Sequence, residues 1–195
     1  MEKDKKKPAD RVGEHPVTYE MYAEMPDDGH RYEIIEGKLE MMTPAPTPTH
    51  QAVHRELIFN LNVNCSSEYV IYYAPIDVIF SRTDVLQPDI LLIHRSRREI
   101  VSERGIEGAP DLVVEILSPS SRRRDKIVKM KTYAKYGVGE YWIVDAASRT
   151  LEQHCLMDGE RYELFNLFEE DDVVSSVKLP CVSFVIRDIF REIPG

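Results

Sequence analysis

Apolar residues follow two different spacings along the middle of the chain, and these spacings predict a helix and several buried strands. Between His50 and Asn64 the apolar residues lie three or four positions apart, which is the period of a helix with one buried face. Other segments are almost wholly apolar or β-branched, which favours strands covered on both faces. These segments span residues 69–80, 85–93, 111–117 and 141–145.

Cap and turn residues place the elements around these strands. Ser118 to Ser121 offers cap residues for a second helix that runs through Tyr136, and Gly137 suits its C-terminal end. The order helix, three strands, helix, strand across residues 50–145 predicts a mixed α/β core. Three later segments, separated by polar turns, predict antiparallel strands at residues 151–156, 162–168 and 173–179.

The N-terminal part adds elements outside this core. Thr18 can cap a short helix through Met25. The segment RYEIIEGKLEMM predicts a hairpin that turns at Glu36-Gly37-Lys38. We expect the charged residues 1–15 to form a flexible tail and residues 16–195 to form a single domain.

Composition narrows the class of protein. The chain has 195 residues, of which 43% are hydrophobic and 30% charged, so it can fill a core. No apolar run approaches the roughly 18 residues of a membrane span, and we expect a soluble, cytoplasmic protein without a membrane partner. The scattered cysteines fit buried thiols in a reducing compartment: Cys65, Cys155 and Cys181.

Two carboxylates interrupt the predicted apolar strands. Asp89 lies in QPDILLI and Glu115 in LVVEILS, and burying either costs several kcal/mol unless it is paired or bound to a metal. If the strands are neighbours, about 4.8 Å apart, both carboxylates can meet at one point and share a divalent cation such as Mg²⁺. The alternative to a metal site is that Asp89 caps a turn after Pro88, or that Glu115 forms an ion pair with a nearby arginine.

Several separate blocks resemble a known family. Pro88-Asp89 followed by Glu115-Ile116-Leu117 resembles the PD-(D/E)XK nuclease core. More specifically, the chain from Tyr19 to about Phe190 resembles the Uma-two family of restriction-type endonucleases. The blocks that carry this resemblance are RYEIIEGKLEMMTPAP with His50, QPDILLI, PDLVVEILSPSS, the D-x3-K-x3-Y pattern and GVGEYWIVD.

The resemblance implies a restriction-endonuclease-like fold, αβββαβ with a mixed central sheet flanked by helices, and metal-dependent hydrolysis of phosphodiester bonds. It implies that Asp89, Glu115 and the Ile116 carbonyl hold one or two Mg²⁺ or Mn²⁺ ions. It further implies that Glu36 on the hairpin completes the metal shell. From the residues alone, Glu36 could equally be an exposed hairpin glutamate.

One motif position departs from the nuclease pattern. The lysine expected two residues after Glu115 is Leu117. The resemblance moves its role, polarising the attacking water, to Lys129. Asp125, Lys129 and Tyr133 are four residues apart and should line one helix face, although periodicity alone leaves Lys126 and Lys131 open as alternatives.

A basic segment follows Glu115 and predicts contacts with nucleic acid. RRRDKIVKMKTYAK holds seven basic residues against one acid, whereas the whole chain has a net charge of −9. A solvated helix face is the alternative. The candidate nucleic-acid-binding residues are His50, Arg122, Arg123, Arg124, Lys126 and Tyr133.

These patterns together predict a Mg²⁺-dependent endonuclease that acts on nucleic acid, foremost DNA. Cutting two strands often uses two sites, which makes a homodimer plausible by analogy. A catalytically inactive nucleic-acid-binding or interaction module on the same fold is the main alternative, favoured by the replaced motif lysine and the acidic net charge. A structural domain held by ion pairs is a further alternative.

Overall fold

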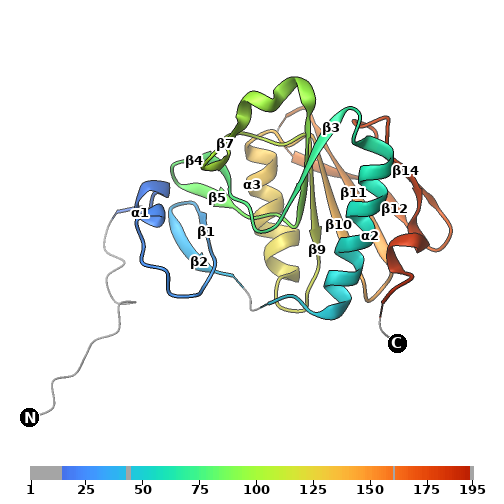
Figure 1. The fold of residues 1–195 in the computed structure, drawn as a ribbon, viewed down its shortest axis with the longest axis horizontal. Coiled ribbons are helices and arrows are strands. Elements are labelled where there is room, and N and C mark those ends of the chain that lie inside the picture. Colours follow the sequence, from blue (N-terminus) through green and yellow to red (C-terminus); the bar gives the residue numbers. More distant parts are fainter. Residues whose placement is uncertain (1–14, 43–44, 160, 194–195) are drawn as a thin grey trace, which may run out of the picture.

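A six-stranded mixed sheet forms the centre of the molecule in the computed structural model, which describes residues 15–42, 45–159 and 161–193 (Figure 1). The predicted tail therefore lies outside the described residues except for His15. In the central sheet only β9 and β10 run parallel to each other. Its strands, in spatial order, are β12 (Arg161–Phe168), β11 (Thr150–Met157), β10 (Glu140–Asp145), β9 (Leu112–Ile116), β6 (Ile90–His94) and β3 (Tyr69–Tyr73).

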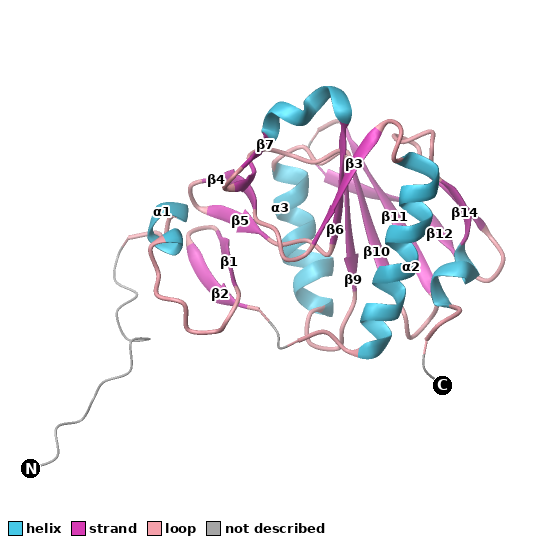
Figure 2. Cartoon of the chain, in the orientation of Figure 1, coloured by secondary structure: helices cyan, strands magenta, loops and turns pink. Residues whose placement is uncertain are grey.

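Helices cover both faces of this sheet (Figure 2). On one face lies α2 (Pro48–Cys65), which begins at the cap residue Thr47 with Pro48 in its first turn. On the other lies α3 (Met130–Lys135), preceded by the π-helical segment η3 (Arg124–Lys129). Since strands between two layers bury both faces, β9 is buried at every position, which explains its apolar sequence.

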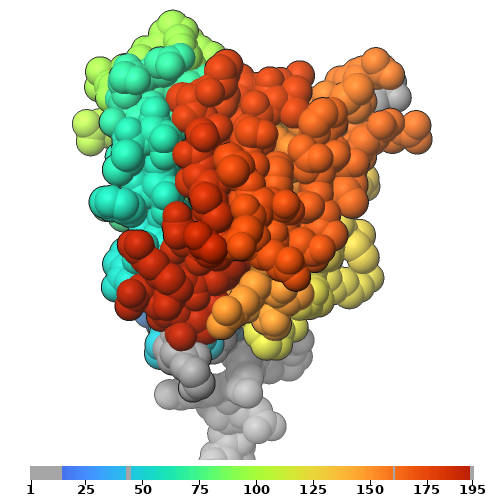
Figure 3. Space-filling view, turned by 90° about the vertical axis from the view of Figure 1, so that its right-hand side faces the viewer, coloured from blue at the N-terminus to red at the C-terminus, as the bar shows by residue number. Residues whose placement is uncertain are grey.

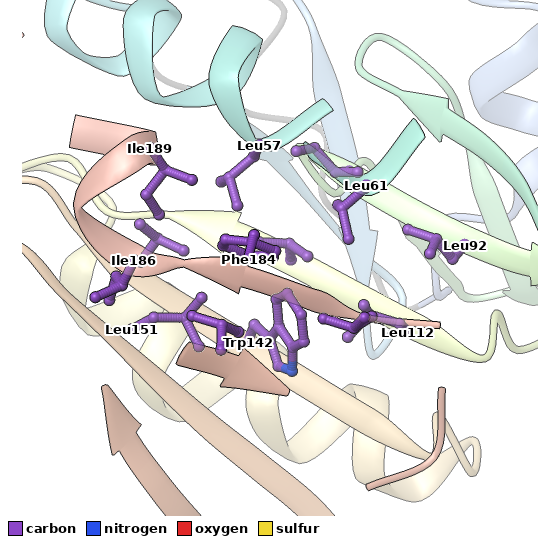
Figure 4. Close-up of a cluster of buried hydrophobic side chains, with 14 of the residues drawn as sticks. Leu57, Leu61, Leu92, Leu112, Trp142, Leu151, Phe184, Ile186 and Ile189 are labelled. Carbon is purple, nitrogen blue, oxygen red and sulfur yellow. The ribbon is translucent and has the colours of Figure 1, made fainter. Parts of the chain in front are cut away.

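The larger hydrophobic core lies between α2 and the sheet. Leu57 and Leu61 of α2 face Trp142 of the sheet (Figure 4). The C-terminal segment closes this core through β13 (Val173–Ser175), β14 (Ser183–Val185) and the 3₁₀ helix η4 (Ile186–Phe190). Figure 3 shows this segment beside α2 on the molecular surface.

A second sheet lies to one side and carries the N-terminal hairpin. The hairpin turns at Glu36 and Gly37, both with positive φ (50° and 74°), as a two-residue turn requires. The short helix α1 (Tyr19–Ala23) begins at its cap residue Thr18, as predicted. The strands of this sheet, in spatial order, are β2 (Lys38–Met41), β1 (Tyr32–Ile35), β5 (Asp84–Leu86), β4 (Val78–Ser81), β8 (Gly105–Ile106) and β7 (Val101–Ser102).

Two predicted strands are wrong in the same way, because each divides between the two sheets. The segment 69–80 forms β3 and β4, and the segment 85–93 forms β5 and β6. Pro75 and Pro88 lie at the two breaks, and a proline cannot donate to a strand ladder. As a result Asp89 lies just before β6 instead of inside a strand.

The predicted second helix begins at Arg122, directly after the predicted cap residues. It continues through η3 and α3 to Lys135, with Gly137 at φ 78° just beyond the end. The residues between β6 and β9 include the 3₁₀ helix η2 (Arg95–Ile100). The predicted strand 173–179 is shortened to β13. No helix in the described ranges is long and apolar enough to cross a membrane.

The expectation of three free thiols is wrong for two of them. Cys65 at the end of α2 and Cys181 before β14 form a disulfide with Cα atoms 5.2 Å apart. They are 116 residues apart, so their spacing gave no sign that they are neighbours. Cys155 is a buried free thiol, and burial raises its pKa to about 11.

The buried carboxylate of Asp84 connects the small sheet to the end of α3. It accepts hydrogen bonds from Tyr136 Oη (2.6 Å), the Glu36 amide (2.7 Å) and Lys135 Nζ (2.9 Å). Burial acts to raise the pKa of Asp84, but these donors outweigh it and hold the pKa below its ordinary value. This contact helps to fix the hairpin against the helix that carries Lys129.

We predict that Asp84→Asn destabilises the protein by about 1–3 kcal/mol at neutral pH, because buried donors lose an ionised acceptor. A folded-state pKa below the unfolded one gives stability at high pH that is lost as pH falls. The difference between parent and variant should therefore shrink as pH falls below about 3.9. Urea unfolding at several pH values measures it, with Glu163→Gln on the exposed side of β12 as control. An effect of Asp84→Asn that grows in acid would contradict the prediction.

Candidate active site

The structure brings the two sequence-predicted acids together where two neighbouring strands of the central sheet, β6 and β9, have their ends. β6 and β9 pair Ile90 with Val114, so one step further along this antiparallel register Asp89 lies opposite Glu115. The Ile116 amide donates to Asp89 Oδ2 at 2.8 Å, which ties the residue before β6 to the end of β9. The carboxylate of Asp89, just before β6, and that of Glu115, on β9, therefore lie next to each other.

Lys129 lies between buried acids from three elements. Its Nζ is 2.9 Å from Glu115 Oε1 and 2.9 Å from Glu33 Oε1. Asp125 Oδ1, one turn earlier, is 3.9 Å away. The side chain of Lys129 is only 3% exposed, so these contacts replace its hydration.

The other two lysines that periodicity allowed point elsewhere. Lys126 Nζ pairs with Glu152 of β11 at 2.6 Å, and Lys131 Nζ pairs with Glu36 at 3.1 Å on the surface. Of the three candidates, Lys129 is the one that contacts Glu115.

The structure does not bring Glu36 into this cluster. Glu36 lies at the hairpin turn with its side chain 60% exposed. The acid that the hairpin contributes is Glu33 on β1, which is fully buried and whose Oε1 accepts from the Gln87 amide at 2.9 Å. At Glu33 the sequence carried the same sign as at Asp89 and Glu115, an acid within an apolar strand, but the family resemblance pointed to Glu36 on the same hairpin.

Asp125, Lys129 and Tyr133 face the cluster together, as their four-residue spacing predicted. The segment that carries the first two is π-helical, a rare conformation that is frequent at functional sites. Tyr133 is fully buried and donates to Glu115 Oε1 at 2.7 Å. The prediction that Tyr133 contacts nucleic acid is therefore wrong, because its hydroxyl is inside the protein.

His50 reaches the same place from the first turns of α2. Its Nε2–H donates to Asp89 Oδ2 over 3.2 Å, and its side chain is 14% exposed. One turn later, His54 Nε2–H donates to the main-chain oxygen of Asp89 at 3.0 Å. The two rings stack with centroids 6.2 Å apart. His50 thus contacts a candidate metal ligand, a role different from the predicted contact with nucleic acid.

Burial and charge shift the pKa values of the central groups in opposite directions. Burial raises the pKa of Glu115 well above its ordinary value, although the charge of Lys129 opposes the rise. Burial alone would lower the pKa of Lys129, but the surrounding carboxylates raise it, so its ammonium is charged at neutral pH. For Asp89, burial is outweighed by the His50 and Ile116 contacts, and its pKa lies below the ordinary value.

The predicted basic residues are mostly engaged with acids. Arg122 pairs with Asp145 at 2.7 Å. Arg124 lies 3.8 Å from Glu33 and 3.7 Å from Glu40, largely covered. Arg123 is exposed and has no ion pair within the part of the chain that the structure describes. With Lys126 also paired, little free positive charge remains in this segment.

The donor chemistry of the cluster fits a small divalent cation. Asp89 and Glu115 supply carboxylate oxygens, and Glu33 Oε2 is buried without a hydrogen-bond partner in the described ranges. Within those ranges no three or more His, Cys, Asp or Glu residues are arranged to hold a metal ion. A cation would therefore rest on the two carboxylates, and Mg²⁺ is commonly held by one or two, with water and substrate completing its shell.

The mixed sheet, the helices on both faces and the acids beside a lysine at one sheet edge are the architecture of a restriction-endonuclease-like nuclease. A family model described as "Putative restriction endonuclease" matches residues 19–185. The chain belongs to this family, Uma2. The predicted family and fold class are thereby confirmed.

Solved structures agree on the fold. A crystal structure from Anabaena variabilis ATCC 29413, described as a "putative nuclease belonging to DUF820", is similar with a TM-score of 0.73 and 23% identity. The similarity covers 90% of this chain and 98% of that one. The type IIG restriction endonuclease BpuSI has a TM-score of 0.41 and 10% identity over 78% of this chain and 17% of its own, too little to add to the assignment. No curated protein matches the chain.

We predict that Lys129→Met destabilises the protein by about 3–5 kcal/mol, because Glu33 and Glu115 lose their buried cationic partner. Added Mg²⁺ should restore part of the lost free energy of unfolding, since a cation that binds only the folded state stabilises it. Urea unfolding with Mg²⁺ and with EDTA measures both effects. Lys131→Met, on the exposed neighbouring position, is the control, and an equal loss in both variants would contradict the prediction.

Proposed function

We propose that this protein is a metal-dependent endonuclease that hydrolyses phosphodiester bonds of nucleic acid, with DNA as the expected substrate. The observation that supports it best is the meeting of Asp89, Glu115 and Lys129 at one sheet edge in a chain of the Uma2 family. Two acids can hold a catalytic cation, and a lysine can stabilise the negative charge of a phosphate beside it.

Asp89 and Glu115, with the Ile116 carbonyl, hold a Mg²⁺ or Mn²⁺ ion in this proposal. When bound, the cation acts as a Lewis acid on the phosphate and stabilises charge in the transition state. The side chain of Asp89 is 20% exposed, which leaves this position open to a substrate.

Lys129 is the charged donor of the proposed centre. Its ammonium orients the attacking water and offsets negative charge on the phosphate. Glu33 and Asp125 keep that ammonium in place through their contacts with Nζ. Water adds to phosphorus, one phosphorus–oxygen bond breaks, and the leaving oxygen takes up a proton. In this proposal the hairpin contributes Glu33 and not Glu36. Glu33 acts as a partner of Lys129 and not as a metal ligand.

Exposed Arg123 and the neighbouring Arg122 are the basic side chains that we assign to the nucleic-acid backbone. We also propose a cytoplasmic location. The Cys65–Cys181 disulfide is the observation against it, because disulfides are rare in reducing compartments. The homodimer stays a prediction by analogy with enzymes that cut two strands.

A nucleic-acid-binding module without turnover is the second candidate. The observation that favours it is Lys129 itself, which is enclosed by three carboxylates and almost fully covered. Such a module would retain DNA in the presence of Mg²⁺ without forming product.

We predict that Asp89→Asn and Glu115→Gln each lower Mg²⁺-dependent cleavage of plasmid DNA by more than about a hundredfold. Several kcal/mol of transition-state stabilisation by a metal correspond to at least this factor. Glu36→Gln should cleave like the parent, because Glu36 lies at the exposed hairpin turn.

The cleavage assay measures nicked and linear plasmid over time with Mg²⁺, Mn²⁺ or EDTA, and a gel-shift assay measures binding on the same DNA. Cleavage by Asp89→Asn at the parent rate would refute the site. Binding without any product from the parent would favour the non-catalytic module.

A further inference from the structure

The two candidate metal ligands are held in the same manner, each by two donors on a single oxygen. Asp89 Oδ2 accepts from the Ile116 amide at 2.8 Å and from His50 Nε2 at 3.2 Å. Glu115 Oε1 accepts from Tyr133 Oη at 2.7 Å and from Lys129 Nζ at 2.9 Å. One donor in each pair is a side chain that the proposed reaction does not itself use.

The second oxygen of each carboxylate is left open. No hydrogen bond from a described residue reaches Asp89 Oδ1 or Glu115 Oε2, whereas the partner oxygen in each group accepts two. A carboxylate fixed through one oxygen cannot rotate freely, so its other oxygen keeps one direction. Ligands held in this way lose little freedom when a cation binds.

We propose that His50 and Tyr133 are positioning residues that orient Asp89 Oδ1 and Glu115 Oε2 toward one divalent cation. This inference rests on the proposed function, because it concerns the same metal. Each residue acts through a carboxylate and touches neither metal nor substrate.

The surroundings of the two side chains suit this role. The Tyr133 ring is fully buried, packs edge-on against Phe80 and lies tilted against Tyr141 with ring centroids 5.1 Å apart, and these contacts fix its hydroxyl. The His50 ring stacks on His54, which is itself anchored to the main chain of Asp89. Within the described ranges, each side chain makes a single hydrogen bond, the one to its carboxylate.

The chain offers a matched control for each residue. Tyr141 is an equally buried tyrosine whose hydroxyl donates to the main-chain oxygen of Asp125 at 3.2 Å. His154 is a mostly buried histidine whose Nε2–H donates to Glu152 Oε2 at 3.1 Å, a carboxylate that is not a candidate metal ligand. Tyr141→Phe and His154→Leu therefore remove the same chemical groups without freeing a candidate metal ligand.

The test is isothermal titration of the full chain with MnCl₂, without nucleic acid. We expect His50→Leu and Tyr133→Phe each to weaken Mn²⁺ binding by about 10- to 100-fold, the usual effect of losing a group that orients a ligand. Tyr141→Phe and His154→Leu should stay within about threefold of the parent, because neither side chain contacts a candidate metal ligand. His50→Gln keeps an N–H donor and should recover most of the affinity.

The outcomes separate this inference from the proposed function. A parent protein that binds no Mn²⁺ overturns both. A parent that binds Mn²⁺ while Tyr133→Phe binds equally well overturns the inference for Tyr133 and leaves the nuclease proposal standing. The same holds for His50 if His50→Leu and His50→Gln bind like the parent. Tyr133→Phe removes a single oxygen atom, so the inference can still be tested with this variant if His50→Leu fails to fold.

Discussion

The ammonium group of Lys129, enclosed by acids from three elements, is the interaction on which the rest of the site depends. Glu33 comes from the small sheet, Glu115 from the central sheet and Asp125 from the same helical segment as the lysine. Burying one charge costs several kcal/mol unless partners replace its water, and here carboxylates from three elements do so. Burial raises the pKa values of Glu115 and Asp125, which reduces the negative charge that Lys129 has to offset.

The fold around this cluster brings segments that are far apart in the sequence to the adjoining ends of β6 and β9. The β6–β9 register sets Asp89 opposite Glu115, α2 delivers His50 from one face, and the π-helical turn delivers Lys129 from the other. The small sheet is needed as well, because its first strand carries Glu33. Asp84 helps to hold that sheet on the end of α3 through its contacts with Lys135 and Tyr136.

The sequence identified the two central acids because a carboxylate in an apolar strand has few explanations, and the family pattern selected Lys129 where helical period could not. Glu33 showed the same anomaly, but the family resemblance pointed to Glu36 on the same hairpin. The predicted strand boundaries were wrong at Pro75 and Pro88. At these prolines the chain crosses from one sheet to the other, and that crossing depends on tertiary packing. The pairing of Cys65 with Cys181 and the contact of Tyr133 with Glu115 depend on packing in the same way.

The distribution of the cluster along the chain has a consequence for folding. Glu33 and Lys129 are almost a hundred positions apart, and their contact requires that both sheets already exist and have docked. Closing loops of that length is slow, so such contacts form late. A partly folded chain in which the two sheets have not docked therefore lacks the complete centre.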